Sequence, residues 1–242
     1  MNTPSSRTRG FSLIELMVVI FIIGIIAAFV VPAMPTILRG SQIAQGSQIL
    51  ADQLSLARQY ALSKNHPVEV RLIRYADPEV PGELDAGGNS SPVNGAYRAI
   101  QILETLDAID TSSGTNDFVR VPLDKPQLLP QAVVLNKGDL STILKESGAF
   151  PTTPSQNTAT AKDPVLPRKI GTNYDYVWFR FMPDGSTNLP PKSNTDANGA
   201  WFITLLNIND PTTGNTPPPN FFTVQIDPVS GAMKQFRPGL AP

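Results

Sequence analysis

The sequence contains no cysteine and only one histidine, His66, in 242 residues. The absence of cysteine excludes disulfide bonds, thiolate zinc sites and cysteine nucleophiles. A single histidine excludes metal sites built from several histidines. The formal net charge is −1, so no overall basic character points to a nucleic-acid partner. No serine–histidine–aspartate set, phosphate-binding glycine loop or catalytic pair of carboxylates stands out, so we expect neither an enzyme nor a bound cofactor.

Charge is also scarce near the N-terminus. Between Phe11 and Val31 the only charged residue is Glu15. A helix over 11–31 would span about 31 Å, enough to cross a hydrocarbon core of about 30 Å, so we expect a transmembrane helix there. A charge at the centre of such a helix costs roughly 2.5–3.5 kcal/mol on insertion scales. The presence of Glu15 therefore needs an explanation.

Two simpler explanations of this segment are a secretory signal peptide and a plain signal anchor. A secretory signal peptide combines a basic region, an apolar region and a small-residue cleavage site. Here the apolar run is longer than usual, Glu15 interrupts its start, and no clear Ala-x-Ala site follows. A plain signal anchor fits the length but leaves Glu15 without a role.

The stretch "RGFSLIELMVVIFIIGIIAAFVVP" resembles the N-terminus of type IV prepilins and type II secretion pseudopilins. The resemblance implies that a membrane prepilin peptidase removes residues 1–10 as a leader by cutting after Gly10. It further implies that the new terminal residue, Phe11, is N-methylated. Glu15 matches the glutamate that, in the related filaments, the amine of a neighbouring subunit neutralises. Opposite charges attract strongly at low dielectric, so the resemblance implies that Glu15 is tolerated because it pairs during assembly.

The pattern after the apolar run predicts that the helix continues over 32–64. Pro32 and Pro35 are expected to bend or locally break it. Polar residues such as Gln53 and Arg58 are expected to lie largely off the buried face. That face follows steps of four and three residues, and its members are Ile43, Ser47, Leu50, Leu54, Ala57 and Ala61.

Residues 65–242 have the pattern of a β-rich head. Apolar and charged residues alternate in 67–75, which predicts a half-buried strand. Further strands are expected at 97–103, 131–135, 174–182, 201–206, 221–227 and 233–237, the last two as a hairpin, with a helical turn at 139–145. Four segments rich in proline, glycine, serine or threonine are expected to be loops or partly disordered: 78–94, 111–116, 151–167 and 211–220.

A second resemblance rests on "ADQLSLARQYALSKNHPVEV", on "FRFMPDGS" and on the closing hairpin. These features resemble H-type minor pseudopilins and FimT-like minor pilins. More narrowly, "RGSQIAQGSQILADQLSLARQYALSKNHPVEVRLIRYADPEVPGE" is similar to the Verru_Chthon cassette protein D family. The resemblance implies an α+β fold, in which a long N-terminal helix precedes a head of antiparallel sheet.

The remaining polar features are interpreted as structural. We expect His66 to be a helix-to-strand junction residue and "PDGS" at 183–186 to be a turn. Lys234 and Arg237 are weak support for nucleic-acid contact, because no aromatic platform accompanies them. A calcium loop needs six to eight converging oxygens, and we expect no metal site at its best candidates, Asn194, Asp196 and Asn198.

Three functions remain open. The first is a structural minor pilin or pseudopilin of a type IV pilus-like or type II secretion fibre. The second is a minor pilin that captures DNA, and the third is a membrane-anchored envelope enzyme. The first implies a single-pass inner-membrane protein with a periplasmic head. Its partners would be the prepilin peptidase, sibling subunits and the membrane, without a small-molecule substrate.

The motif makes a direct prediction about processing. The mature chain should begin at Phe11 with a methylated amine, and loss of Arg7 and Arg9 should change the formal charge from −1 to −3. Mass spectrometry of the N-terminal peptide tests this. An intact Met1, or a cut near Ala33, would contradict the prepilin interpretation.

Overall fold

The computed structural model describes residues 11–30, 34–80, 82–84, 91–106, 119–144, 156–159, 163–167, 170–191, 200–210, 212 and 216–238. The chain divides into two compact units, Met1–Gly40 and Ser41–Pro242, and each is described by itself. Several residues singled out above lie outside the described residues, namely Gly10, Pro32, Asn194, Asp196 and Asn198.

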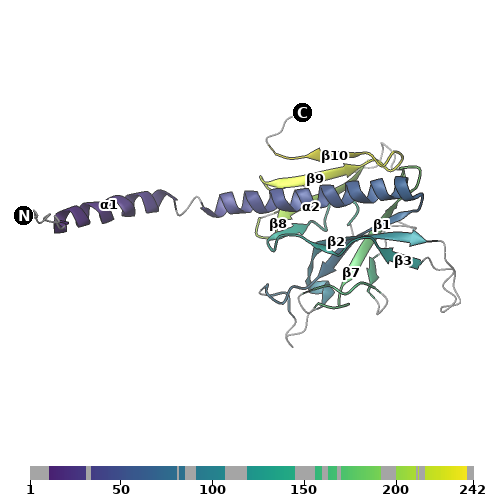
Figure 1. The fold of residues 1–242 in the computed structure, drawn as a ribbon, viewed down its shortest axis with the longest axis horizontal. Coiled ribbons are helices and arrows are strands. Elements are labelled where there is room, and N and C mark those ends of the chain that lie inside the picture. Colours follow the sequence, from purple (N-terminus) through teal and green to yellow (C-terminus); the bar gives the residue numbers. More distant parts are fainter. Residues whose placement is uncertain are drawn as a thin grey trace, which may run out of the picture. The chain divides into compact units, whose positions relative to one another are not determined.

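The apolar N-terminal segment forms helix α1 (Leu13–Val30), drawn in purple in Figure 1. The large apolar side chains from Phe11 to Ile26 are between 44% and 81% exposed. Among the described residues, no helix is both long and apolar enough to cross a membrane. This differs from the transmembrane helix expected over 11–31. The observed helix has 18 residues.

The second helix, α2 (Met34–Lys64), has 31 residues. It ends where Asn65 adopts a left-handed φ of 57°, a common way to close a helix. Pro35, expected at a helix break, is the second residue of α2. Proline is tolerated there because N–H groups in the first turn have no intrahelical acceptor. Pro32 lies outside the described residues, so a break at these prolines stays a prediction.

The apolar stripe of α2 is buried, as its periodicity predicts. Its members Ile43, Leu50, Leu54, Ala57 and Ala61 are fully buried, and Ser47 is nearly so. They share one hydrophobic core with side chains of the sheet. Gln53, expected off the stripe, is also buried. It lies on the flank of the stripe beside Leu54, so the sheet covers more of the helix than the apolar residues alone indicate.

Ten strands form one sheet, and every pairing among the described residues is antiparallel. The main path is β10-β9-β8-β5-β2-β1-β7-β6, while β3 and β4 both pair with β2. The fold is therefore α+β with a large antiparallel sheet, as expected. The strands are β1 (Val68–Tyr75), β2 (Ala96–Leu106), β3 (Val119–Pro122), β4 (Gln127–Leu128), β5 (Val133–Leu135), β6 (Gln156–Thr158), β7 (Asp175–Phe181), β8 (Trp201–Asn207), β9 (Phe221–Ile226) and β10 (Met233–Phe236).

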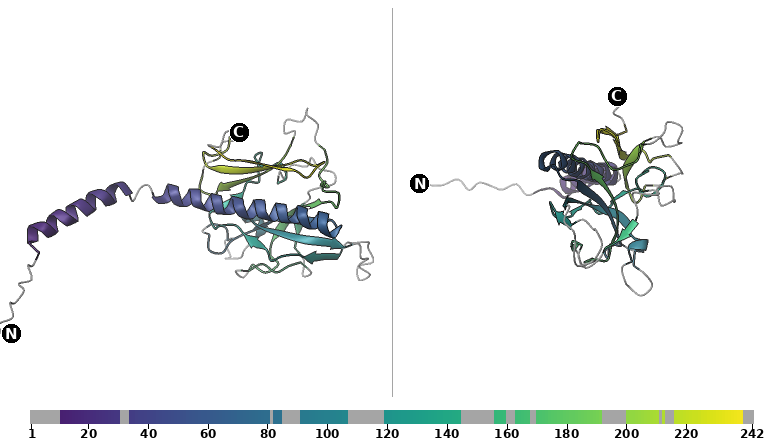
Figure 2. Two further views of the ribbon diagram at one scale, coloured as in Figure 1. Left: turned by 45° about the horizontal axis from the view of Figure 1, so that its top comes forward. Right: turned by 90° about the vertical axis from the view of Figure 1, so that its right-hand side faces the viewer.

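Two groups of strands flank α2. We call β1, β2, β3, β4, β6 and β7 the first half-sheet, and β5, β8, β9 and β10 the second half-sheet. The two meet where β2 pairs with β5 at one position, Tyr97↔Leu135, whereas β1 pairs with β2 at eight. Figure 1 shows α2 between the yellow strands β9 and β10 and the strands β1 and β2, and the left view of Figure 2 shows the same arrangement.

The strand β1 differs from the half-buried strand expected at 67–75. All eight of its residues are buried. Val68, Val70 and Leu72 belong to the core under α2, and Ile73 belongs to a second apolar cluster. That cluster includes Leu166, Ile170 and Tyr174, so part of the segment expected to be a loop covers the second face of the sheet. The charged residues of β1 are therefore buried rather than solvated.

Two further expectations are corrected. The segment 151–167, expected to be a loop, contains the strand β6, whose backbone pairs with β7. The segment 139–144 forms turns rather than a helical turn. Its hydroxyl oxygens accept hydrogen bonds from β8. The backbone N–H of Thr204 donates to Ser141 Oγ at 2.9 Å, and the backbone N–H of Phe202 donates to Thr142 Oγ1 at 2.7 Å. These bonds give hydrogen-bond partners to the backbone N–H groups of β8 that lie beyond the end of β5.

The buried face of α2 generates a stability prediction with a control on the same helix. Leu54 is fully buried and Leu38 is 61% exposed. Leu54→Ala should lower the free energy of unfolding by about 2–5 kcal/mol, because it removes buried surface and leaves a cavity. Leu38→Ala should cost less than about 1 kcal/mol. Urea unfolding of the full chain measures both, and equal losses would show that the stripe does not hold the head together.

Candidate functional site

The first candidate site is the start of α1. Phe11 is 81% exposed, and Glu15 lies in the first turn. The backbone N–H of Ser12 donates to Glu15 Oε2 at 2.9 Å. Ser12 precedes the first helical residue and Glu15 is the third, which is the arrangement of a capping box. The first turn of α1 thus hydrogen-bonds its own glutamate.

This contact was not expected, although the sequence carries its signal. The letters "SLIE" match the S-x-x-E pattern that precedes an apolar helix. A negative charge in the first turn also interacts favourably with the helix dipole. Glu15 therefore has a local stabilising role in addition to the role implied by the prepilin resemblance.

The surroundings of Glu15 are apolar. The side chains of Phe11, Ile14, Val18 and Val19 join it around a shallow groove of about 350 Å³. Glu15 is the one charged side chain in that lining. A carboxylate in an apolar environment is costly unless a cation or hydrogen-bond donors accompany it. The geometry is suited to bind a compact cation such as an amine.

The other polar candidates from the sequence have structural positions. His66 lies between the end of α2 and the start of β1, and 183–186 forms a turn. In that turn Asp184 Oδ1 accepts both the backbone N–H and the hydroxyl of Ser186, and these bonds hold its pKa below the ordinary range. Lys234 is exposed on β10. Within the part of the chain that the structure describes, no group of three acidic or histidine side chains is placed to hold a metal ion.

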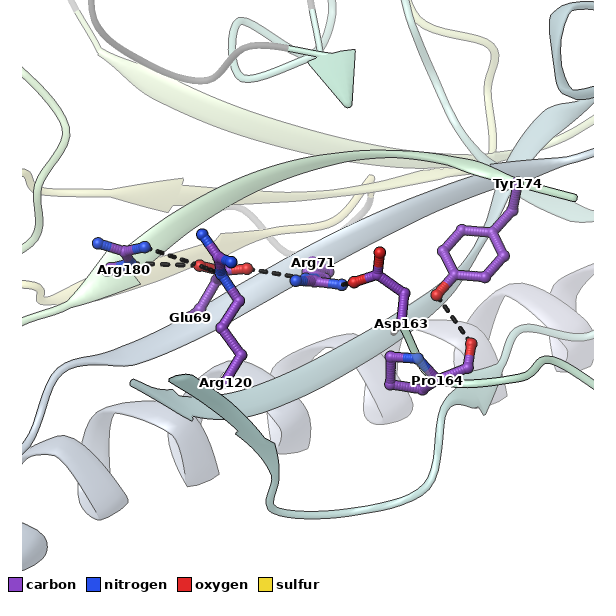
Figure 3. A network of polar contacts seen from close by, with 7 residues as sticks. All are labelled: Glu69, Arg71, Arg120, Asp163, Pro164, Tyr174 and Arg180. Atoms are coloured by element: carbon purple, nitrogen blue, oxygen red, sulfur yellow. Dashed lines mark hydrogen bonds and ion pairs between the residues drawn. The ribbon is translucent and has the colours of Figure 1, made fainter. Parts of the chain in front are cut away.

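The head contains a buried charged cluster that the sequence analysis missed, drawn in Figure 3. We call it the Glu69 cluster; it consists of Glu69, Arg71, Arg120, Asp163 and Arg180. Glu69 is fully buried on β1. Its Oε1 accepts Arg71 Nε at 2.8 Å, and its Oε2 accepts Arg180 Nη2 at 3.0 Å and Arg120 Nε at 3.3 Å. Arg71 Nη1 in turn donates to Asp163 Oδ1 at 2.5 Å.

Aromatic rings complete the cluster. The guanidinium of Arg71 lies 4.0 Å from the ring centroid of Tyr176, and that of Arg180 lies 4.4 Å from the ring of Trp178. Burial opposes the charge of Arg71, but Glu69 and the hydrogen bond to Asp163 outweigh it and raise the pKa of Arg71. Burial also raises the pKa of Tyr174, whose hydroxyl donates to the Pro164 carbonyl at 2.8 Å.

The chemistry of the Glu69 cluster is structural. Both oxygens of Glu69 are hydrogen-bonded to guanidinium groups, and these three cations occupy the positions that a metal ion would need. The cluster joins β1, β3, β7 and the segment that contains Asp163. It therefore fixes the layer that covers the second face of the sheet.

Removing one charge from this cluster should be costly. Glu69→Gln leaves three guanidinium groups beside a neutral amide, and loss of one partner of a buried ion pair typically costs about 3–5 kcal/mol. The matched change Glu79→Gln, at an exposed position, should change stability by less than about 0.5 kcal/mol. Chemical denaturation compares them, and an unaffected Glu69→Gln variant would contradict the structural role.

Comparison with known proteins identifies the N-terminal segment. Residues 5–31 match the family model described as the prokaryotic N-terminal methylation motif. No curated protein sequence matches the chain.

Two structures of the minor pseudopilin EpsH from the type II secretion system of Vibrio cholerae were found, each with a TM-score of 0.37. One is 10% identical and covers 82% of this chain and 99% of its own. The other is 12% identical, with coverages of 84% and 98%. The comparison therefore shows that residues 5–31 carry a prokaryotic N-terminal methylation motif.

Proposed function

We propose that this chain is a minor pilin or pseudopilin subunit that is cleaved after Gly10 and then assembles into a fibre through its N-terminal helix. The observation that carries the proposal is Glu15, a single carboxylate in the first turn of a helix whose other large side chains are apolar and exposed. Such a helix lacks a covering surface of its own. The proposal supplies one, because lipid covers it before assembly and neighbouring helices cover it afterwards.

The proposed cleavage changes the charge beside Glu15. While residue 10 is attached, the nitrogen of Phe11 belongs to a neutral amide. Cutting the chain turns it into an amine that carries a positive charge, about one helical turn from Glu15. The Ser12 amide binds Oε2. Among the described residues no hydrogen bond reaches Oε1, so an amine can bind there without displacing the cap.

The charge pair would act between chains as well as within one. An amine and a carboxylate attract each other strongly where little water is present. Two helices that place these groups side by side are held in one register, because a shift by one residue separates the charges. In this proposal the cost of the charge in lipid favours assembly, and N-methylation of Phe11 marks the processed subunit.

The proposal includes the cellular location and the partners. The whole apolar sequence 11–31, which extends beyond the 18 residues of α1 at both ends, holds the chain in the inner membrane as a single pass, with the head in the periplasm. The prepilin peptidase and sibling subunits of a type II secretion or pilus-like fibre are its partners. Capture of nucleic acid is disfavoured at the aromatic–arginine pairs of the head, because the guanidinium groups of Arg71 and Arg180 bind Glu69.

Two substitutions at Glu15 separate charge pairing from capping. Glu15→Gln keeps an oxygen that can accept the Ser12 N–H but removes the charge, and Glu15→Val removes both. Both variants should be cleaved, because the bond after Gly10 is unchanged, and both should insert at least as readily as the parent. Neither should enter fibres. Mass spectrometry of processed protein in the membrane and in sheared fibres measures each step.

The outcomes distinguish the two roles of Glu15. If Glu15→Gln enters fibres like the parent and Glu15→Val does not, capping rather than charge is required, and the pairing proposal fails. If both enter fibres normally, Glu15 has no role in assembly. A variant that remains uncut would mean that Glu15 acts in processing instead.

A further inference from the structure

The two half-sheets contact each other at more than one place. At the first, β2 and β5 pair only at Tyr97↔Leu135. Both half-sheets nevertheless bury apolar side chains in the same core: Phe179 and Phe181 come from the first, and Trp201 and Val224 from the second. A sheet with so narrow a junction needs other contacts to hold its two parts around the helix.

A second set of contacts lies between two segments that we call the clasp. One is the turn 183–186 with the following Thr187, after β7, and the other is the turn 227–232, which joins β9 to β10. The carbonyl oxygen of Pro228 accepts the N–H of Thr187 at 2.9 Å and its hydroxyl at 3.1 Å. Nearby, Trp201 Nε1 donates to the Pro190 carbonyl at 2.9 Å. The clasp thus connects strands that are far apart along the sheet.

The helix α2 takes part in the clasp. Arg58 Nη2 donates to the carbonyl oxygen of Ser230 at 3.1 Å. A Cβ atom on Gly185 would lie 3.3 Å from Leu62 Cδ2, so the first turn rests against the last turns of α2. Each turn is braced by its own aspartate: Asp184 binds Ser186, and Asp227 accepts the Ser230 hydroxyl at 2.8 Å.

Two glycines allow the turns to approach. Gly185 and Gly231 have φ values of 85° and 61°, a region that side chains other than glycine rarely adopt. A Cβ atom on Gly231 would lie 2.1 Å from the carbonyl oxygen of Gly185. A larger residue at position 231 cannot fit without separating the turns.

We propose that the clasp is a latch that holds the second half-sheet closed over α2, and that its opening releases the second half-sheet as one unit about the β2–β5 junction. The first half-sheet stays packed, because its strands pair with one another over long registers and the Glu69 cluster fixes its outer layer. The head therefore has two regions with different free energies of opening.

Hydrogen–deuterium exchange of the full chain in detergent tests this device. The test variant is Gly231→Ala, and the matched control is Gly171→Ala. Gly171 has a φ of 63°, but a Cβ atom there would have no neighbour within 4 Å. The two changes share the backbone strain, and only the first separates the turns.

In Gly231→Ala, amide exchange in β8, β9 and β10 should rise by about tenfold or more, while β1, β2 and β7 change by less than about twofold. Gly171→Ala should affect only its own segment. A milder variant, Thr187→Val, removes one of the two bonds to Pro228 and should produce the same pattern with a smaller rise. It keeps the test valid if Gly231→Ala fails to fold.

Two results would overturn the proposal. Exchange that rises equally in both half-sheets would mean that the head opens as one unit. Exchange that stays unchanged in β8–β10 for both Gly231→Ala and Thr187→Val would mean that the clasp does not control opening. Neither result bears on Glu15 or on fibre assembly.

Discussion

The burial of one face of α2 between two half-sheets is the interaction on which the head depends. The stripe from Ile43 to Ala61 contributes to a core that both half-sheets complete. Without the helix, the narrow β2–β5 junction would leave two small sheets with apolar faces open to water. Burial of apolar surface is the dominant favourable term in folding. The two half-sheets therefore depend on the helix to bury their apolar faces.

The second face of the sheet is covered by a layer that is held in a different way. There the covering layer is held by charges, because Glu69 and Asp163 bind the guanidinium groups of Arg71, Arg120 and Arg180. Buried ion pairs contribute little net stability compared with apolar packing, but an incomplete pair is strongly destabilising. The cluster thus selects one arrangement of the outer layer, while the core under α2 supplies the stability.

The sequence predicts those features that depend on neighbouring residues. The stripe of α2 repeats along a single helix, and the β9–β10 hairpin is closed by a short turn, so both could be recognised. The Glu69 cluster could not, because its arginine and aspartate partners lie up to 111 residues away from Glu69. Burial of Gln53 and of β1 likewise depends on segments that fold over them from elsewhere. The Ser12–Glu15 cap is local and was recognisable, but the prepilin resemblance drew attention to a different role of Glu15.

The protein combines a folded head with an N-terminal helix that is apolar, exposed and marked by one carboxylate. The central proposal is that the chain enters a fibre after prepilin processing. The most direct test is to purify fibres from cells with and without an active prepilin peptidase and to detect head peptides by mass spectrometry. The account predicts head peptides in fibres only when the peptidase is active, with the unprocessed chain retained in the membrane otherwise. Equal distribution of the chain in both kinds of cell would contradict it.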